Sequence, residues 1–257
     1  MNESCRGRPD AAQPLWLTPR VEVLSWLRPA RTIPVTRWRC AGRWRPTPLG
    51  TVILVVGLAL FGFGEAFLVE AGLGVSPWTV LAQGLATKLP ISIGVATFLV
   101  GGIVLLLWIP IREKPGMGTV LNIIVISSSL QLGVTVIPSP THLGLQLLWV
   151  LVGIGLIGVG SGLYLTTNLG PGPRDGWMTG IHQRTGWPVG RVRTGIEIIA
   201  LSVGWLLGGT VGIGTLMFAV LIGPSVAYGL MLAGAIGRVP GEPEVSVSDD
   251  EFPELDA

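Results

Sequence analysis

The sequence predicts an all-α polytopic membrane protein built from two inverted repeats of three membrane spans each, at about 52–134 and 148–230. Three observations predict this class. The chain of 257 residues is 49% hydrophobic and only 12% charged, whereas soluble domains carry about 25% charged residues. Six apolar runs are long enough to cross a bilayer. The two halves also align without a gap when the chain is shifted by 96 residues.

The apolar runs define the predicted spans, because roughly 20 apolar residues cover the hydrocarbon core of a bilayer. They lie at about 50–70, 92–111, 118–137, 144–167, 194–210 and 214–235. With their connections they form a transmembrane domain over 48–238, in which 48–137 is the first repeat and 144–238 the second.

Two charged tails flank this domain. Residues 1–47 contain nine arginines and three acidic residues, and residues 239–257 are acidic without a basic residue. Neither tail has enough apolar residues for a core, so we expect both to be largely disordered. The cysteines Cys5 and Cys40 and the two histidines form no ligand cluster, so we expect no metal site and no cofactor.

Basic residues predict the orientation, because Lys and Arg concentrate in cytoplasmic loops. Four arginines at 37–45 precede the first span, and others follow the second, fourth and sixth spans, whereas the loops on the opposite side hold only Lys88. This pattern predicts six crossings with both termini in the cytoplasm. It requires that 77–88 and 173–184 do not cross; if they cross, the protein has eight spans.

The segments 77–88 and 173–184 are each too short to span a membrane at 1.5 Å per residue. Each begins with proline, which suits the first position of a helix. We therefore expect two short re-entrant or interfacial helices, each after a Gly/Pro break.

The breaks recur in the two halves, as GLGVSPWTV (72–80) and NLGPGPRDG (168–176). Residues that match at the interval of 96 include Gly57 and Gly153, Gly64 and Gly160, Leu73 and Leu169, Gly74 and Gly170, and Pro77 and Pro173. Three crossings per repeat would invert the second copy, and transporters with inverted repeats bind solutes near broken helices at the repeat interface. Close packing through small residues also explains glycine in both halves, so ligand-lined and purely architectural breaks both stay open.

Polar residues in or beside apolar spans are candidates for function. The candidates for substrate binding are Trp78, Gln83, Asn168, Arg174 and Asp175, and the candidates for coupling or structural polar roles are Glu65, Asn122, Gln131, Arg193 and Glu197. Glu65 has no local partner and is the better candidate for proton or cation coupling. Arg193 and Glu197 fit an ion pair within one helix. Arg174 and Asp175 fit either the binding of an anionic group or pairing with each other.

Catalytic motifs for serine hydrolases, zinc proteases and P-loop ATPases are absent from the sequence, so we do not expect an enzyme. Two functions stay open. The first is a secondary transporter or permease-like protein for a small solute, and the second is a non-transporting membrane scaffold or accessory protein for a biosynthetic or export complex. The expected partners are the lipid bilayer and an unknown small solute, with a homo-oligomer left open and no nucleic acid.

Five motifs carry a resemblance to a known family. They are GLGVSPWTVLAQGL (72–85), LLLWIPIREKPGMGTVLN (105–122), NLGPGPRDGWMTGI (168–181), RVRTGIE (191–197) and GWLLGGTVGIGTLMFAVLIGP (204–224). Together they resemble the YczE group of the YczE/YitT membrane proteins over about 45–238. The resemblance implies a bacterial plasma (inner) membrane protein without an established substrate. The family pattern has acidic residues where this chain has Thr79 and Gln131.

Overall fold

The computed structural model of the protein describes residues 33–238. Within this part of the chain the regular structure is helical, apart from one isolated bridge between Thr36 and Arg238. The helices are α1 (Pro48–Ala71), α2 (Pro77–Lys88), α3 (Ile93–Leu106), α4 (Trp108–Ile111), α5 (Met117–Val136), α6 (Leu143–Leu165), α7 (Pro173–Thr185), α8 (Val189–Leu206) and α9 (Ile213–Gly237). The predicted all-α class is confirmed.

Five segments in the described residues are long and apolar enough to cross a membrane: α1, α3 with α4, α5, α6 and α9. The sixth predicted span, 194–210, corresponds to α8. This helix begins earlier than predicted, directly after Pro188, and takes in Arg191 and Arg193. Its first turns are therefore charged, while the rest of the helix is apolar. The chain is a polytopic membrane protein, and its environment is a lipid bilayer.

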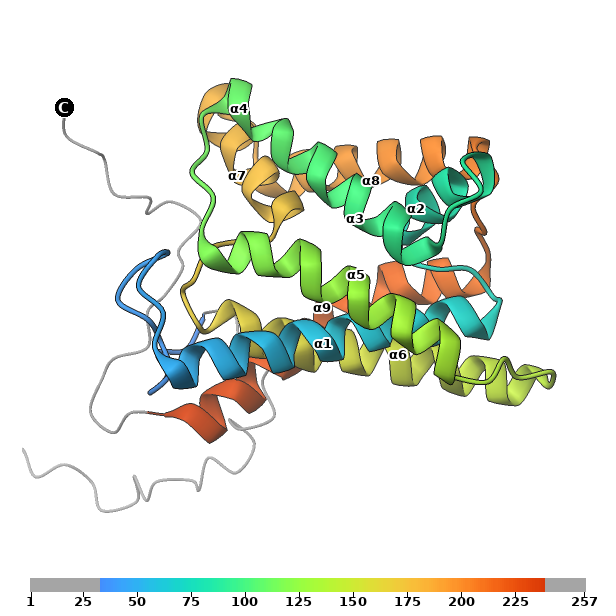
Figure 1. The fold of residues 1–257 in the computed structure, drawn as a ribbon, viewed down its shortest axis with the longest axis horizontal. Coiled ribbons are helices and arrows are strands. Elements are labelled where there is room, and N and C mark those ends of the chain that lie inside the picture. Colours follow the sequence, from blue (N-terminus) through green and yellow to red (C-terminus); the bar gives the residue numbers. More distant parts are fainter. Residues whose placement is uncertain (1–32, 239–257) are drawn as a thin grey trace, which may run out of the picture.

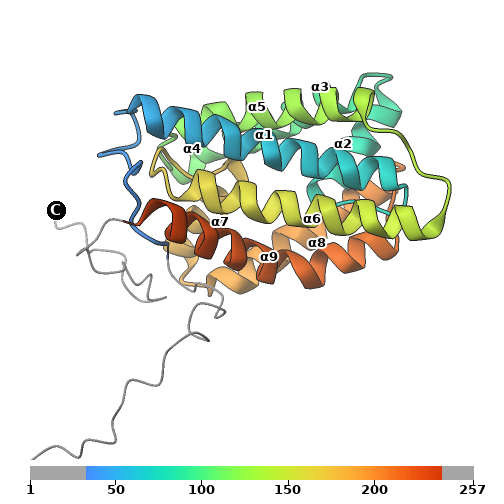
Figure 2. The same ribbon diagram turned by 90° about the horizontal axis from the view of Figure 1, so that it is seen from below.

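The helices lie in two layers (Figures 1 and 2). One layer holds α5, α1, α6 and α9 in that order, and consecutive members of this series pack against each other. The other layer holds α3, α4 and α8 with the short helices α2 and α7 between them. In Figure 1, α1, α5 and α8 run from left to right, and α3, α6 and α9 run from right to left.

The interval of 96 residues recurs in the positions of the helices. Three pairs of helices begin 96 residues apart: α2 and α7 at Pro77 and Pro173, α3 and α8 at Ile93 and Val189, and α5 and α9 at Met117 and Ile213. Left-handed backbone recurs at the same interval, at Gly72 and Asn168, at Gly74 and Gly170, and at Arg112 and Gly208. In Figure 1, α3 runs opposite to α8, and α5 runs opposite to α9.

Glycines bring α1 and α6 close together in the middle of the first layer. A Cβ atom on Gly64 would lie 2.6 Å from the carbonyl oxygen of Gly153, and one on Gly57 would lie 2.8 Å from that of Gly160. Gly153 and Gly160 are the residues 96 positions after Gly57 and Gly64. Small residues thus set the distance between these helices, as in many membrane bundles.

The amino-terminal segment 33–47 differs from the sequence-based prediction. We expected it to belong to a disordered tail, but it forms a strap across one end of the bundle. Trp38 and Cys40 are each 2% exposed. The indole Nε1 of Trp38 donates to Thr166 Oγ1 at 2.9 Å, and the amide of Cys40 donates to the carbonyl of Thr167 at 2.9 Å. Residues 1–32 and 239–257 lie outside the described residues. The predicted disorder of these two segments therefore stays a prediction.

The strap also holds the start of α5. Arg43 pairs with Glu113 at 3.0 Å, its carbonyl accepts from the amide of Met117 at 3.0 Å, and Trp44 Nε1 donates to the carbonyl of Pro115 at 2.9 Å. Trp38 and Trp44 supply apolar surface in a segment that is otherwise rich in Arg and Pro. The strap therefore joins the ends of α4, α5, α6 and α9.

Candidate functional site

Glu65 lies on α1, about 9 Å from its carboxyl-terminal end at 1.5 Å per residue, and is 3% exposed. Two hydroxyl groups donate to its carboxylate. Ser76 Oγ lies 2.9 Å from Oε1, and Thr79 Oγ1 lies 2.8 Å from Oε2. Both donors come from the start of α2, so the chain folds back along α1 after the first break, defined as residues 72–76.

The first break places the amino terminus of α2 next to Glu65. Ser76 is the N-cap of α2, its side chain accepts from the amide of Thr79, and Pro77 follows it. Gly74 has φ of 101°, which favours glycine. The carbonyl of Leu73 accepts from the amide of Gly214 at 2.8 Å, at the start of α9. The positive end of the α2 dipole therefore faces a carboxylate.

The second break, residues 166–172, is held in a similar way by α5. The amide of Gly118 donates to the carbonyl of Leu169 at 2.8 Å, and Thr119 Oγ1 donates to the carbonyl of Pro171 at 2.8 Å. The indole of Trp108 then donates to the carbonyl of Pro173 at 2.7 Å. Each break is thus bound to the last long helix of the other half of the chain.

Arg174 and Asp175, at the start of α7, point in different directions. Asp175 Oδ2 accepts from the hydroxyl of Tyr164 on α6 at 2.9 Å. The guanidinium carbon of Arg174 lies 5.1 Å from the centre of the Phe61 ring on α1. Among the described residues, Arg174 makes no hydrogen bond and no ion pair. The two residues do not pair with each other, which was one of the two predicted arrangements.

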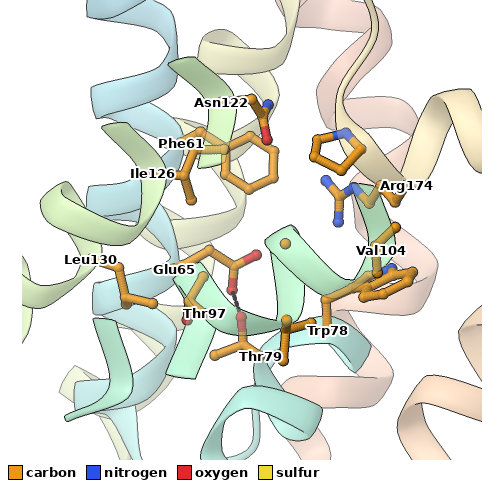
Figure 3. A pocket seen from close by; sticks show the side chains of 13 residues that line it. Phe61, Glu65, Trp78, Thr79, Thr97, Val104, Asn122, Ile126, Leu130 and Arg174 are labelled. Atoms are coloured by element: carbon orange, nitrogen blue, oxygen red, sulfur yellow. Dashed lines mark hydrogen bonds between the residues drawn. The ribbon is translucent and has the colours of Figure 1, made fainter. Parts of the chain in front are cut away.

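A cavity of about 90 Å³ lies between Glu65 and Arg174 (Figure 3). We call it the Glu65 cavity. Its lining comes from α1, α2, α3, α5 and α7: Phe61, Glu65, Trp78, Thr79, Thr97, Val100, Gly101, Val104, Asn122, Ile126, Leu130, Pro173 and Arg174. Glu65 and Arg174 point into it from opposite sides. They are the only charged groups in this lining.

A second cavity, of about 100 Å³, lies on the other side of Arg174 and Trp78. We call it the Tyr164 cavity, and its polar lining residues are Ser161, Tyr164, Arg174, Asp175, Arg193 and Glu197. Its apolar lining includes Ile157, Ile196, Phe218, Ile222 and Val226. In the described residues no group of three His, Cys, Asp or Glu side chains gathers in a way that could hold a metal ion.

Ten positions in the lining of the Glu65 cavity recur in the lining of the Tyr164 cavity at the interval of 96. The pairs are Phe61 and Ile157, Glu65 and Ser161, Trp78 and Arg174, Thr79 and Asp175, Thr97 and Arg193, Val100 and Ile196, Gly101 and Glu197, Asn122 and Phe218, Ile126 and Ile222, and Leu130 and Val226. The positions match while the chemistry differs. The carboxylate of Glu65 in one cavity stands where the other has the hydroxyl of Ser161, so the two cavities differ in the charge of their lining.

Comparison with known proteins places this architecture in a family. A model of the family of unknown function DUF6198 matches residues 49–229, which include both breaks and all but the last turns of α9. The chain belongs to the DUF6198 family. No solved structure matches it.

Three relatives of this DUF6198 protein come from two bacteria. An uncharacterized protein of Haemophilus influenzae is 41% identical over 212 residues, which cover 82% of this chain and 97% of the relative. The uncharacterized membrane protein YczE of Bacillus subtilis is 32% identical over 68% of this chain and 82% of its own length. The uncharacterized protein YyaS of Bacillus subtilis is 26% identical over 65% and 86%. The predicted resemblance to the YczE group is confirmed.

The DUF6198 structure brings seven of the ten candidate residues to the two cavities. Glu65, Asn122, Trp78 and Arg174 line the Glu65 cavity, and Trp78 and Arg174 also line the Tyr164 cavity with Asp175, Arg193 and Glu197. Arg193 Nε lies 3.1 Å from Glu197 Oε1, so the predicted ion pair is present. Trp78 stands between the cavities and not at the edge of the bundle.

The other three candidates make hydrogen bonds away from both cavities. Gln83 Oε1 accepts from the amide of Thr210 at 3.0 Å, and Gln131 Oε1 accepts from the amide of Gly94 at 3.0 Å. Asn168 Nδ2 donates to the carbonyl of Cys40 at 3.0 Å, which ties the second break to the strap. Each of these contacts holds a loop or a helix start in place.

Sequence reasoning missed the residues that engage the candidates. Ser76 and Thr79 bind Glu65, Tyr164 binds Asp175, and Phe61 lies against Arg174. A hydroxyl residue before Pro77 is a helix-start signal, but it gives no direction for the preceding break. Counting 96 residues from Arg174 leads to Trp78 and would have indicated that the two breaks face one another.

Proposed function

We propose that this membrane protein is a small-solute secondary transporter, and not an enzyme, whose binding site is the Glu65 cavity. The observation that carries the proposal is the origin of the lining. Glu65, Trp78 and Asn122 come from the first half of the chain, and Arg174 comes from the second. Transporters built from inverted repeats bind their solutes at the interface of the repeats, beside broken helices.

An inverted repeat is part of this proposal. Its support is the recurrence of helix starts, left-handed residues and cavity linings at an interval of 96, with α3 opposed to α8 and α5 to α9. Such a relation supplies two similar breaks that enter the bundle from opposite ends. Opposed, similar halves are what alternating access of one site to the two sides of a membrane requires.

Orientation is a further part of the proposal. The strap arginines, Arg112, Lys114 and Arg238 lie at one end of the bundle, because Arg43 pairs with Glu113 and Thr36 bridges to Arg238. By the positive-inside rule this end faces the cytoplasm. The protein then lies in the bacterial plasma membrane with both termini inside.

The first test removes the charges at the second break. Arg174→Ala or Asp175→Asn is expected to abolish transport while leaving the amount of protein in the membrane unchanged, because Arg174 lines the Glu65 cavity and the adjacent Asp175 binds Tyr164 in the lining of the second cavity. A thermal-stability screen of small solutes on purified protein identifies a solute, since ligands stabilise the folded state that binds them. Uptake of that solute into proteoliposomes is then measured for the variants.

Arg184→Ala is the matched control, because Arg184 lies on the same helix but is exposed and lines neither cavity. Its uptake should equal that of the unchanged protein. Normal uptake in both the Arg174 and the Asp175 variants would refute the transporter proposal. In that case a scaffold role would gain support if deletion of residues 241–257 impaired the process of a partner that co-purifies.

A further inference from the structure

The guanidinium group of Arg174 has donors without acceptors. Arginine carries five N–H donors and no acceptor. Asp175 and Glu65 attract the guanidinium through space, but neither carboxylate lies within ion-pair distance of it; Glu65 accepts from Ser76 and Thr79, and Asp175 accepts from Tyr164. Arg174 contacts the face of Phe61 but has no hydrogen-bond acceptor among the described residues. Its donors face the cavities that it lines.

An arginine without an acceptor is unfavourable in a site with few polar groups. Polar groups removed from water need hydrogen-bond partners, and charged residues within membrane proteins usually pair or line a solute path. The planar guanidinium fork matches a carboxylate, which accepts two parallel hydrogen bonds from it. A carboxylate in the cavity would therefore supply the acceptors that this half-buried guanidinium lacks.

The surroundings of Arg174 define the rest of the ligand. Phe61, Val100, Val104, Ile126 and Leu130 give the Glu65 cavity an apolar wall. The cavity volume of about 90 Å³ suits a small solute.

Glu65 faces one charged group in this site. Arg174 approaches from α7 and attracts it through space, α2 supplies the hydroxyls of Ser76 and Thr79, and the lining from α3 and α5 is uncharged. Because both carboxylate oxygens already accept hydrogen bonds, Glu65 does not need a cationic ligand. The asymmetry between a satisfied carboxylate and an unsatisfied guanidinium favours an anion over a cation or a zwitterion.

We propose that the Glu65 cavity binds a small monocarboxylate with a short aliphatic body, its carboxylate on Arg174 and its chain against Phe61 and the α3 and α5 wall. This inference rests on the proposed function and names its substrate class. Glu65 stands on the opposite side of the cavity, where its negative charge repels a second anion and limits the site to one.

Butyrate is the probe, because it has a carboxylate and six non-hydrogen atoms. Butyramide and butylammonium are its neutral and cationic counterparts. Binding to the purified full-length protein is measured by saturation-transfer NMR and by titration calorimetry. Butyrate is expected to bind, and its two counterparts are expected to bind about 10-fold more weakly or not at all, since hydrogen bonds to charged groups contribute at this level.

Two variants test the roles of Arg174 and Glu65 separately. Arg174→Gln is expected to lose about 10- to 100-fold in butyrate affinity, with its fold checked by size exclusion and thermal unfolding. Glu65→Gln is expected to bind butyrate at least as tightly as the unchanged protein, because it removes a negative charge that faces the ligand. Arg184→Ala, outside both linings, should bind normally.

Four outcomes overturn the inference. Preference for butylammonium assigns the site to a cation, and preference for butyramide assigns it to a neutral solute. Weaker butyrate binding by Glu65→Gln makes the carboxylate part of the anion site and contradicts its opposing role. If none of the three probes binds while Arg174→Ala still abolishes uptake of another solute, the monocarboxylate class is wrong and the transporter proposal stands.

Discussion

Adjacent residues at the start of α7 point in different directions: Arg174 lines both cavities, whereas Asp175 lines only the Tyr164 cavity. Successive residues of a helix are rotated by about 100°, so neighbours in sequence do not face each other. Arg174 turns toward Phe61 and the Glu65 cavity, while Asp175 turns toward Tyr164. The predicted alternative in which these two residues pair treated sequence proximity as spatial proximity, and the helix turns their side chains apart.

The hydroxyl of Thr79 offers a test of the Glu65 site. Thr79→Val keeps the shape of the side chain but removes a donor to a buried carboxylate. It is expected to lower the free energy of unfolding by about 1–3 kcal/mol, because a hydrogen bond to a charged group is lost and the carboxylate keeps only Ser76. Thermal unfolding in detergent, followed by circular dichroism, measures the change.

Thr87→Val is the matched control on the same helix. Thr87 is exposed, and its hydroxyl donates only to the carbonyl of Gln83 within α2 at 2.9 Å. Its substitution should change stability little. Equal destabilisation by the two variants would show that α2 merely disfavours valine and that the bond to Glu65 contributes nothing.

The candidate site could be predicted only in part from residue types. Rare charges near apolar runs identified Glu65 and Arg174, because charge in a membrane interior is unfavourable without a purpose. The hydroxyl partners of Glu65 could not be predicted. Their position depends on the first break folding back along α1, and a turn sequence with Gly and Pro permits several directions. Gln83 and Gln131 were also selected as polar residues near apolar spans, but their side chains accept hydrogen bonds from backbone amides outside both cavities.

Among the elements, the positions of the breaks followed closely from the sequence. Proline at 77 and 173 begins α2 and α7, as predicted, because proline lacks the N–H that the first turn does not use. The start of α8 was placed too late. The prediction followed hydropathy and excluded Arg191 and Arg193, although Pro188 already marked a helix start.

The strap shows where composition misleads. Nine arginines in 47 residues predict disorder, but burial of Trp38 and hydrogen bonds to Thr166 and Thr167 order the last part of this region. Burial of this large aromatic side chain, together with these hydrogen bonds, offsets part of the conformational entropy that the segment loses. Which surface it meets depends on where α6 and α9 end, and that is a property of the assembled bundle.

The contact of α1 with α6 yields a prediction at the level of elements. Gly64→Ala is expected to destabilise the protein by about 2 kcal/mol or more, because the added Cβ would meet the backbone of Gly153 and force the helices apart. The unfolding midpoint in detergent should fall. Uptake should fall as well, since Phe61 and Glu65 line the cavity from the same helix.

Gly155→Ala is the control for this substitution. It lies on α6 with open space around the position of the new Cβ. Alanine favours helix over glycine by up to about 1 kcal/mol, so this variant should be as stable as the unchanged protein or slightly more stable. Loss of stability in Gly155→Ala equal to that in Gly64→Ala would refute the packing explanation.

For the whole molecule, the orientation proposal predicts a labelling pattern. Four exposed positions are suited to single cysteine substitutions: Thr87, Ser139, Thr185 and Thr210. In a protein without Cys5 and Cys40, impermeant reagents outside the cell should label 87, 139 and 210, and 185 should react only after permeabilisation. The reason is that neither short helix crosses the bundle. The end of α2 lies at the same end of the bundle as the end of α1, and the end of α7 lies at the same end as the end of α6.

The opposite result has a definite meaning. Labelling of 185 from outside and of 87 only from inside would mean that α2 and α7 cross the membrane. The halves would then be parallel, and the proposed alternating access would lose its basis. Removal of Cys40 needs its own stability control, because this residue of the strap is buried.

The strap makes the two ends of the molecule unequal. Its hydrogen bonds to Thr166, Thr167 and Asn168 lie at the entrance to the second break, and the described part of the chain has no corresponding segment at the first. Any motion that parts α6 from α9 at the strapped end must break these contacts, whereas the same motion at the other end leaves them intact. If the protein alternates access as proposed, the strap is expected to favour the conformation that is closed at its own end of the bundle.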